Sequence, residues 1–243
     1  FLSHLLSNPD SNSTKDAFEV LAANKIDEYD ALKEHTLDTT GYIKILISGS
    51  PESLSKRILI GLYQAVSTFW SSRKGRSPAI LSKLENAANV GCSSSETVKL
   101  FKKVQEEISK IEGKKPKGVL LVIDELGKFL EYEARHYGAN DVFLLQELAE
   151  LACKGHTCNL LMFVLLHQSF EQYAKGLGES LKNEWAKVQG RFEEVPFLES
   201  SEQTLKVVSK AIINNYTDAE FSNTAGNITK IVNLLATEKA LPS

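Results

Sequence analysis

The fold of this chain is decided by residues 119–125, which read Val119-Leu120-Leu121-Val122-Ile123-Asp124-Glu125. Five apolar β-forming residues without polar alternation predict a strand that is covered on both faces, as in a parallel sheet. The strand ends in two adjacent carboxylates, Asp124 and Glu125. The last residues of a buried strand in an open α/β sheet reach the carboxyl edge, where ligands bind. The sequence therefore predicts an acidic site at that edge.

Three other stretches predict further strands of the same sheet. Gly41–Ile47 and Asn159–Leu166 are apolar runs, and Glu193–Phe197 predicts a short edge strand. Segments with helical spacing separate the strands, which gives the order β-α-β-α-β. The expected fold class is therefore α/β, with a mainly parallel sheet and helices on both faces. We expect Asn159–Leu166 to lie beside the 119–123 strand.

The domain organisation follows from these elements. Residues 1–199 are expected to form one α/β core, in which the polar, Ser-rich stretch 71–98 is an insertion. Residues 200–243 predict the start of a small helical segment, with a helix over 202–214. The helix after the first strand is expected to begin at Ser50 as N-cap, with Pro51 in its first turn.

Composition restricts the classes of partner and compartment. The net charge is −3, so DNA binding is possible through loops such as Lys114–Lys117 but is not supported by the overall charge. No apolar run approaches the roughly 20 residues that span a bilayer, and no signal-peptide pattern is present. Three cysteines are too few and odd in number for a disulfide framework, which predicts a cytoplasmic protein. The sequence Cys153–Cys158, with His156 inside it, is either a turn with semi-buried thiols or a partial metal site.

The acidic pair has a specific chemical interpretation. Two adjacent carboxylates repel each other unless a cation or hydrogen-bond donors compensate them. Mg²⁺ with nucleotide phosphates supplies this compensation: Asp124 would hold the ion through water, and Glu125 would orient and deprotonate the attacking water. In the alternative interpretation the two acids only cap the following helix, Leu126–Tyr132.

With these residues in place, the chain resembles P-loop ATPases of the additional-strand branch, in particular AAA+-type and STAND modules, over Gly41–Lys210. The resemblance implies that His167 or Gln168, which follow the 159–166 strand, contacts the γ-phosphate or positions water. It also implies that Arg191 acts as an arginine finger on the γ-phosphate of a neighbouring subunit.

The residues leave other roles open for these three side chains. In the alternative interpretation, His167 and Gln168 are simple polar caps at the end of their strand. The alternative for Arg191 is a surface ion pair with Glu193 or Glu194.

One departure from this family is serious, because the G-x-x-x-x-G-K-[ST] phosphate loop is absent. Residues 48–56 form a strand–turn–helix pattern with the wrong glycine spacing, where Pro51 removes an amide and Glu52 would repel phosphate. The resemblance implies that the loop lies upstream of Phe1. We expect this chain alone to bind ATP poorly, to lack the first strand beside 159–166, and to self-associate or bind protein partners through exposed edges.

The sequence thus predicts an ATP-binding, Mg²⁺-dependent ATPase module of a larger protein. Over Asp124–Tyr132 and His167–Tyr173 it also resembles large bacterial ATPases encoded beside DNA-modification and phage-resistance genes, which implies antiviral defence. Two alternatives remain: a nucleotide-free interaction scaffold of the same fold, and a Mg²⁺-dependent nuclease that uses the same acids. The nuclease would need a further ligand, for which Glu131, Glu171 and His167 are the candidates.

Overall fold

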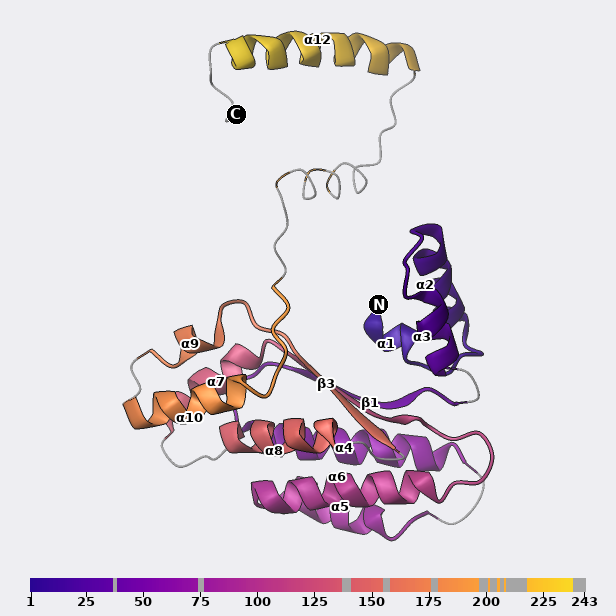
Figure 1. Cartoon of the computed structure of the whole chain (residues 1–243), viewed down its shortest axis with the longest axis vertical. Helices are drawn as coiled ribbons and strands as arrows, with labels where there is room; N and C mark the ends of the chain where they lie inside the picture. The colour runs from indigo at the N-terminus through magenta and orange to yellow at the C-terminus, as the bar shows by residue number, and fades with distance from the viewer. Residues whose placement is uncertain are drawn as a thin grey trace. The chain divides into compact units, whose positions relative to one another are not determined.

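The chain divides into two compact units, Phe1–Glu193 and Glu194–Ser243. The computed structural model (Figure 1) describes residues 1–36, 39–73, 77–136, 141–154, 158–175, 179–196, 201, 205, 208 and 218–237. The second unit contains helix α12 (Asp218–Thr237), on which Ile228, Ile231 and Leu234 are exposed.

A parallel sheet forms the centre of the first unit. Its described strands are β1 (Tyr42–Ser48), β2 (Gly118–Asp124) and β3 (Asn159–Val164), in the order β1-β2-β3. Both pairings are parallel, and Ser48 is the register partner of Asp124. The predicted middle position of residues 119–123 and the predicted neighbour 159–166 are confirmed. The α/β class is confirmed with them.

Helices cover one face of this sheet and build the core (Figure 1). The helices packed there are α4 (Leu54–Ser71), α6 (Ser94–Ser109) and α8 (Asp141–Cys153), and α5 (Ile80–Val90) packs against α4 and α6. Ile45 and Leu121 project from the sheet into this core and are almost completely buried, as are Phe101 of α6 and Leu148 of α8. Leu84 of α5 is also fully buried. The stretch expected as an insertion therefore contributes to the main core.

On the opposite face of the sheet, the described residues provide cover only near the amino ends of the strands. Helices α1 (Leu2–Leu5), α2 (Asn12–Ala23) and α3 (Tyr29–Thr36) lie there. Leu6 packs on Tyr42 and Leu120, forming a small second cluster. Further along the strands, Leu46 is 59% exposed and Phe163 is 41% exposed. The unbroken apolar run 159–166 is typical of a strand covered on both faces, but β3 is not covered in this way, because the short helix α1 contacts only one end of the sheet.

Three more helices lie beyond the carboxyl ends of the strands: α7 (Leu126–Arg135), α9 (Phe170–Tyr173) and α10 (Glu179–Gln189). Phe170 meets Trp185 edge to face, with 5.6 Å between ring centroids, which fastens α9 to α10. A β-carbon on Gly127 would collide with the Tyr173 ring, so only glycine allows α7 and α9 to approach this closely.

Two local predictions are corrected by the structure. Residues 193–196 are irregular rather than a strand, and Phe197 lies outside the described residues. Val195 is 67% exposed, and the following Pro196 cannot donate a hydrogen bond to a ladder. Helix α4 begins at Leu54, and its N-cap is Ser53 rather than Ser50. Of the helix predicted over 202–214, residues 205 and 208 are described, and both are helical.

Among the helices of the described residues, none combines the length and the apolar character that a bilayer crossing requires.

Candidate functional site

Asp124 and Glu125 stand at the carboxyl end of the middle strand. Asp124 is the last residue of β2 and is exposed, and the register places it beside Ser48 of β1. Within the described part of the chain, the Asp124 carboxylate forms no ion pair or hydrogen bond with another residue. Its negative charge is therefore available to a cation from solution.

The backbone of Glu125 adopts an uncommon conformation. Its φ is 53° and its ψ is 44°, which lies in the left-handed region and costs a non-glycine residue on the order of 1 kcal/mol. This turn carries the chain from β2 into α7, where the Leu126 N–H donates to the Leu165 carbonyl at 3.0 Å. Gly49 lies against the same turn, since a β-carbon there would collide with the Glu125 carbonyl oxygen.

The side chain of Glu125 is held by two cationic or polar neighbours. Lys128 Nζ lies 2.6 Å from Glu125 Oε2, and His167 Nε2 lies 3.4 Å from Oε1. The hydrogen bond from Lys128, followed by that from His167, lowers the pKa of Glu125 below its usual value. Although Glu125 is the N-cap residue of α7, its side chain accepts no capping hydrogen bond. The helix-capping interpretation therefore fails for this side chain.

The structure joins some of the predicted site residues and separates others. His167 follows β3 and reaches Glu125, so the ends of two neighbouring strands meet as expected from the parallel order. Gln168 is exposed, and within the described residues no hydrogen bond or ion pair joins it to either acid. Arg191 Nη2 lies 3.2 Å from Glu150 Oε1 on α8, a partner that was not anticipated beside Glu193 and Glu194.

Lys128 is a site residue that the sequence prediction missed. A lysine three residues after Glu125 faces the same side of a helix, so the spacing alone was a usable signal.

A different carboxylate occupies the start of α4, in the strand–turn–helix segment 48–56. Asp141 Oδ2 accepts from the Leu54 N–H at 2.7 Å, and Oδ1 accepts from the Ser55 N–H at 3.2 Å. Free amides at a helix start are the groups that hold phosphate in other proteins. Asp141 is buried and already fills that position, which agrees with the interpretation of 48–56 as an ordinary turn.

The oxygen ligands at this edge fit Mg²⁺ only if water and a bound phosphate supply the remaining ligands. Asp124 offers an exposed carboxylate, with Ser48 next to it in register. No group of three His, Cys, Asp or Glu side chains within the described ranges is placed to hold a metal ion. Mg²⁺ keeps several waters and commonly takes one or two carboxylates together with substrate phosphates. Asp124 would be the residue that holds it.

Two other metal hypotheses receive no support. Burial raises the pKa of the Cys158 thiol to about 11, so it remains protonated, and Cys153 is exposed. His156 lies outside the described residues. For the nuclease, His167 reaches Glu125, whereas within the described residues no hydrogen bond or ion pair joins Glu131 or Glu171 to either acid.

Comparisons with protein-family models, with curated proteins and with solved structures found no match for this chain.

Proposed function

We propose that this chain supplies the acidic half of a Mg²⁺-dependent ATP site in an AAA+-like ATPase module of a larger protein. One observation carries the proposal: two adjacent acids end the middle strand of a parallel sheet, and a histidine from the next strand contacts one of them at 3.4 Å. This edge is where open α/β folds bind their ligands.

Asp124 has the role of metal-holding residue. Its carboxylate is exposed and uncompensated within the described residues, so a divalent cation would relieve the local negative charge. When bound, Mg²⁺ would neutralise the charge of the nucleotide phosphates. Ser48 lies beside Asp124 and can hydrogen-bond to water in the same position.

Glu125 has the role of general base. The carboxylate accepts hydrogen bonds, can orient a water molecule and can take its proton. Lys128 and His167 now hold both of its oxygens, and their hydrogen bonds lower its pKa and therefore its basicity. Turnover in this arrangement requires at least one of these two contacts to open. His167 and Lys128 are both exposed at the surface and can rotate away.

The phosphate-binding amides come from outside the segments described above. The sequence lacks the phosphate-loop motif, and Asp141 fills the start of α4. Arg191, whose partner Glu150 lies in the same chain, is proposed to act on the nucleotide of an adjacent subunit after assembly. Any role of His167 toward a γ-phosphate rests on its position at the end of β3.

The proposal is tested by the Mg²⁺ dependence of ATP hydrolysis in the larger protein. Asp124→Asn removes the charge but preserves the shape, so the Mg²⁺ concentration for half-maximal turnover should rise about tenfold or more. Asp30→Asn, at an exposed position of α3, is the matched control. An unchanged Mg²⁺ requirement in Asp124→Asn would contradict the proposal.

The uncovered sheet face favours one alternative, the nucleotide-free scaffold. Leu46 and Phe163 are exposed next to Val122 on this face, and exposed apolar patches often mark protein contacts. The scaffold would bind its partner equally well with and without ATP, whereas the ATPase would show a nucleotide-dependent difference. Pull-down of the partner at both nucleotide conditions separates the two.

A further inference from the structure

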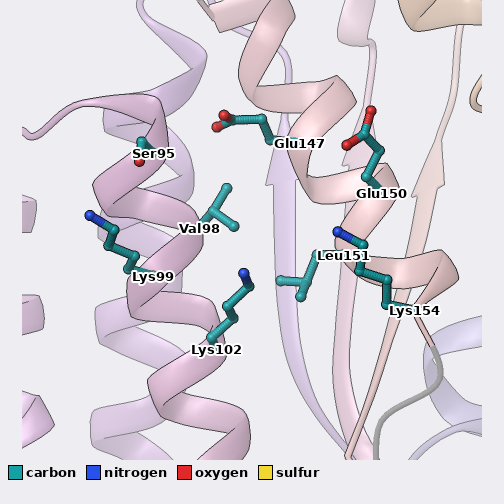
Figure 2. A pocket seen from close by; sticks show the side chains of 8 residues that line it. All are labelled: Ser95, Val98, Lys99, Lys102, Glu147, Glu150, Leu151 and Lys154. Atoms are coloured by element: carbon teal, nitrogen blue, oxygen red, sulfur yellow. The ribbon is translucent and has the colours of Figure 1, made fainter.

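Two groups of polar side chains lie away from the acidic site and differ in their surroundings. Figure 2 shows a groove between α6 and α8, where Lys102 and Lys154 are exposed to solvent. In the second group, His35, Tyr42 and Lys117 are buried or partly buried and are joined by hydrogen bonds. Tyr42 is the first residue of β1 and Lys117 directly precedes β2, so this group attaches the last turn of α3 to the amino end of the sheet.

The hydrogen bonds of His35 determine which of its ring nitrogens carries the proton. Lys117 Nζ lies 3.0 Å from His35 Nδ1 and 2.8 Å from the His35 carbonyl oxygen. Because an ammonium group can only donate, Nδ1 must be the unprotonated nitrogen. Nε2 therefore carries the proton and donates to the Tyr42 hydroxyl oxygen at 2.8 Å. The complete set of hydrogen bonds requires a neutral imidazole.

The groups around His35 do not compensate a second positive charge. Within the described residues, both hydrogen bonds of the Lys117 ammonium group go to His35, and no carboxylate pairs with it. Burial, followed by the charge of Lys117, lowers the pKa of His35 below its usual 6.5. The groups beside Tyr42 are neutral at this pH: Asn159 is hydrogen-bonded to its hydroxyl, and burial raises the pKa of the Cys158 thiol to about 11. The other charged residues of α3 are exposed: Asp30, Lys33 and Glu34.

Helix α3 depends on these polar contacts because it buries little apolar surface. Of its described residues, Thr36 alone is buried. The helix packs on α2, where Tyr29 meets Phe18 edge to face, and the His35 ring lies nearly parallel to the Tyr42 ring with 6.1 Å between centroids. A helix of eight residues is not stable by itself in water. Loss of the His35 contacts should therefore open the last turn of α3.

We propose that His35 is an acid-sensitive latch, which holds the end of α3 on the sheet while it is neutral and releases it when it is protonated. Protonation of Nδ1 removes the acceptor of Lys117 and brings two positive charges together. The folded chain binds this proton less readily than the unfolded chain, so the local stability of α3 should fall as the pH drops below 6.5. The opening ends before Thr40, whose N–H donates to the Lys115 carbonyl at 3.1 Å in a bond that does not titrate. The latch lies apart from the acidic edge and does not depend on the proposed ATPase function.

NMR spectroscopy of this chain tests the latch. Labelling with ¹⁵N-histidine shows the ring nitrogens of the five histidines, and the signal that is absent from His35→Gln belongs to His35. At neutral pH this ring should carry its proton on Nε2, and it should titrate below pH 6.5. Amide exchange of α3, corrected for the intrinsic rate at each pH, should become about tenfold faster or more once His35 is protonated. The opposite tautomer, or α3 amides with the same protection before and after the titration, would overturn the proposal.

Four variants separate the latch from a general effect of acid. His35→Gln cannot titrate, so the protection of α3 amides should be the same at neutral and acidic pH. Lys117→Gln supplies an oxygen that can accept from protonated Nδ1, so the pKa of His35 should rise and acid should no longer open α3. His4→Gln, exposed on α1, and Asp38→Asn, which lies outside the described residues, should keep the acid response of the wild type. An acid response that survives in His35→Gln or Lys117→Gln, or one that is lost in either control, would overturn the proposal.

Discussion

The Asp141 carboxylate accepts a 2.7 Å hydrogen bond from the backbone N–H of Leu54, 87 residues earlier in the chain. A second bond to the Ser55 N–H completes the cap of α4. The first residue of α8 thereby fixes the start of α4, and both helices cover the same face of the sheet. Because Asp141 is buried, these amides have no water to replace the lost acceptor.

Asp141→Ala should therefore destabilise the protein by about 2–3 kcal/mol, the range of a lost cap combined with lost hydrogen bonds to a charged group. Asp141→Asn keeps one acceptor oxygen and should cost about half as much. Urea unfolding followed by circular dichroism measures both. Asp16→Ala, exposed within α2, should change stability by less than about 0.5 kcal/mol. A similar loss in Asp16→Ala and Asp141→Ala would contradict a specific capping role.

Glu133 predicts a pH dependence of stability. Burial, with the charge of Asp141 adding to it, raises the pKa of Glu133 from 4.5 to about 7. Its Oε2 is buried and lacks a donor among the described residues. Between pH 4.5 and about pH 7, Glu133 holds a proton in the folded protein that it has lost in the unfolded chain. Stability should therefore fall as pH rises through this window and remain reduced above it.

Glu133→Gln removes this titration. At pH 8 the free energy of unfolding of the variant should exceed that of the wild type by about 1 kcal/mol. This value is discounted for the partial exposure of the side chain to water. At pH 5 the difference in the free energy of unfolding between the variant and the wild type should be smaller. Urea midpoints at several pH values give the comparison, with Glu131→Gln on the exposed side of α7 as control. A constant difference between Glu133→Gln and wild type at all pH values would exclude the titration.

Glu125→Gln tests the general base. In the larger protein it should preserve ATP binding but lower hydrolysis by a factor of about 10² or more, because shape is retained while the base is lost. Single-turnover hydrolysis and nucleotide titration measure the two effects separately. Glu131→Gln again serves as control, since Glu131 does not contact the site. Near-normal turnover in Glu125→Gln would leave this residue without a catalytic role.

Arg191→Ala tests action between subunits. The variant should lower turnover of the assembled protein with little change in ATP affinity, because an arginine finger contributes mainly in the transition state. Mixing it with Glu125→Gln subunits should restore part of the activity if each defect lies on a different chain. A defect of equal size in a strictly monomeric form would exclude action across an interface.

This chain alone should bind ATP·Mg²⁺ weakly, with a dissociation constant no tighter than about 1 mM. Most phosphate affinity in P-loop proteins comes from loop amides and the loop lysine, and neither is present. Calorimetry on residues 1–243 is the measurement. Micromolar binding would mean that a phosphate site exists within this chain, and residues 48–56 would then need a different interpretation.

The sequence predicted the elements that depend on local pattern. The 119–123 strand was predicted closely, because an apolar run is encoded by neighbouring residues. The start of α4 was misplaced at Ser50, because one of its stabilising groups, Asp141, is remote in sequence. The exposure of Phe163 was also missed, since it depends on how far α1 reaches over the sheet.

The candidate site was predicted in part. Parallel strand order was enough to bring Asp124, Glu125 and His167 to one edge. The left-handed backbone of Glu125 was not predictable, because glutamate has no preference for that region. The ion pair between Arg191 and Glu150 depends on the packing of the end of α10 near α8, which no local pattern encodes.

The middle position of β2 also sets the order in which the sheet comes apart. Its strand is paired on both sides, whereas β3 is paired on one side within the described residues and carries the exposed Phe163. Amide hydrogens of β2 should therefore exchange with deuterium last, at the rate of global unfolding, and those of β3 through smaller openings. His167 follows β3, which opens before β2, while Asp124 and Glu125 follow the strand that opens last. The acidic pair would thus keep its geometry while its histidine neighbour detaches and returns.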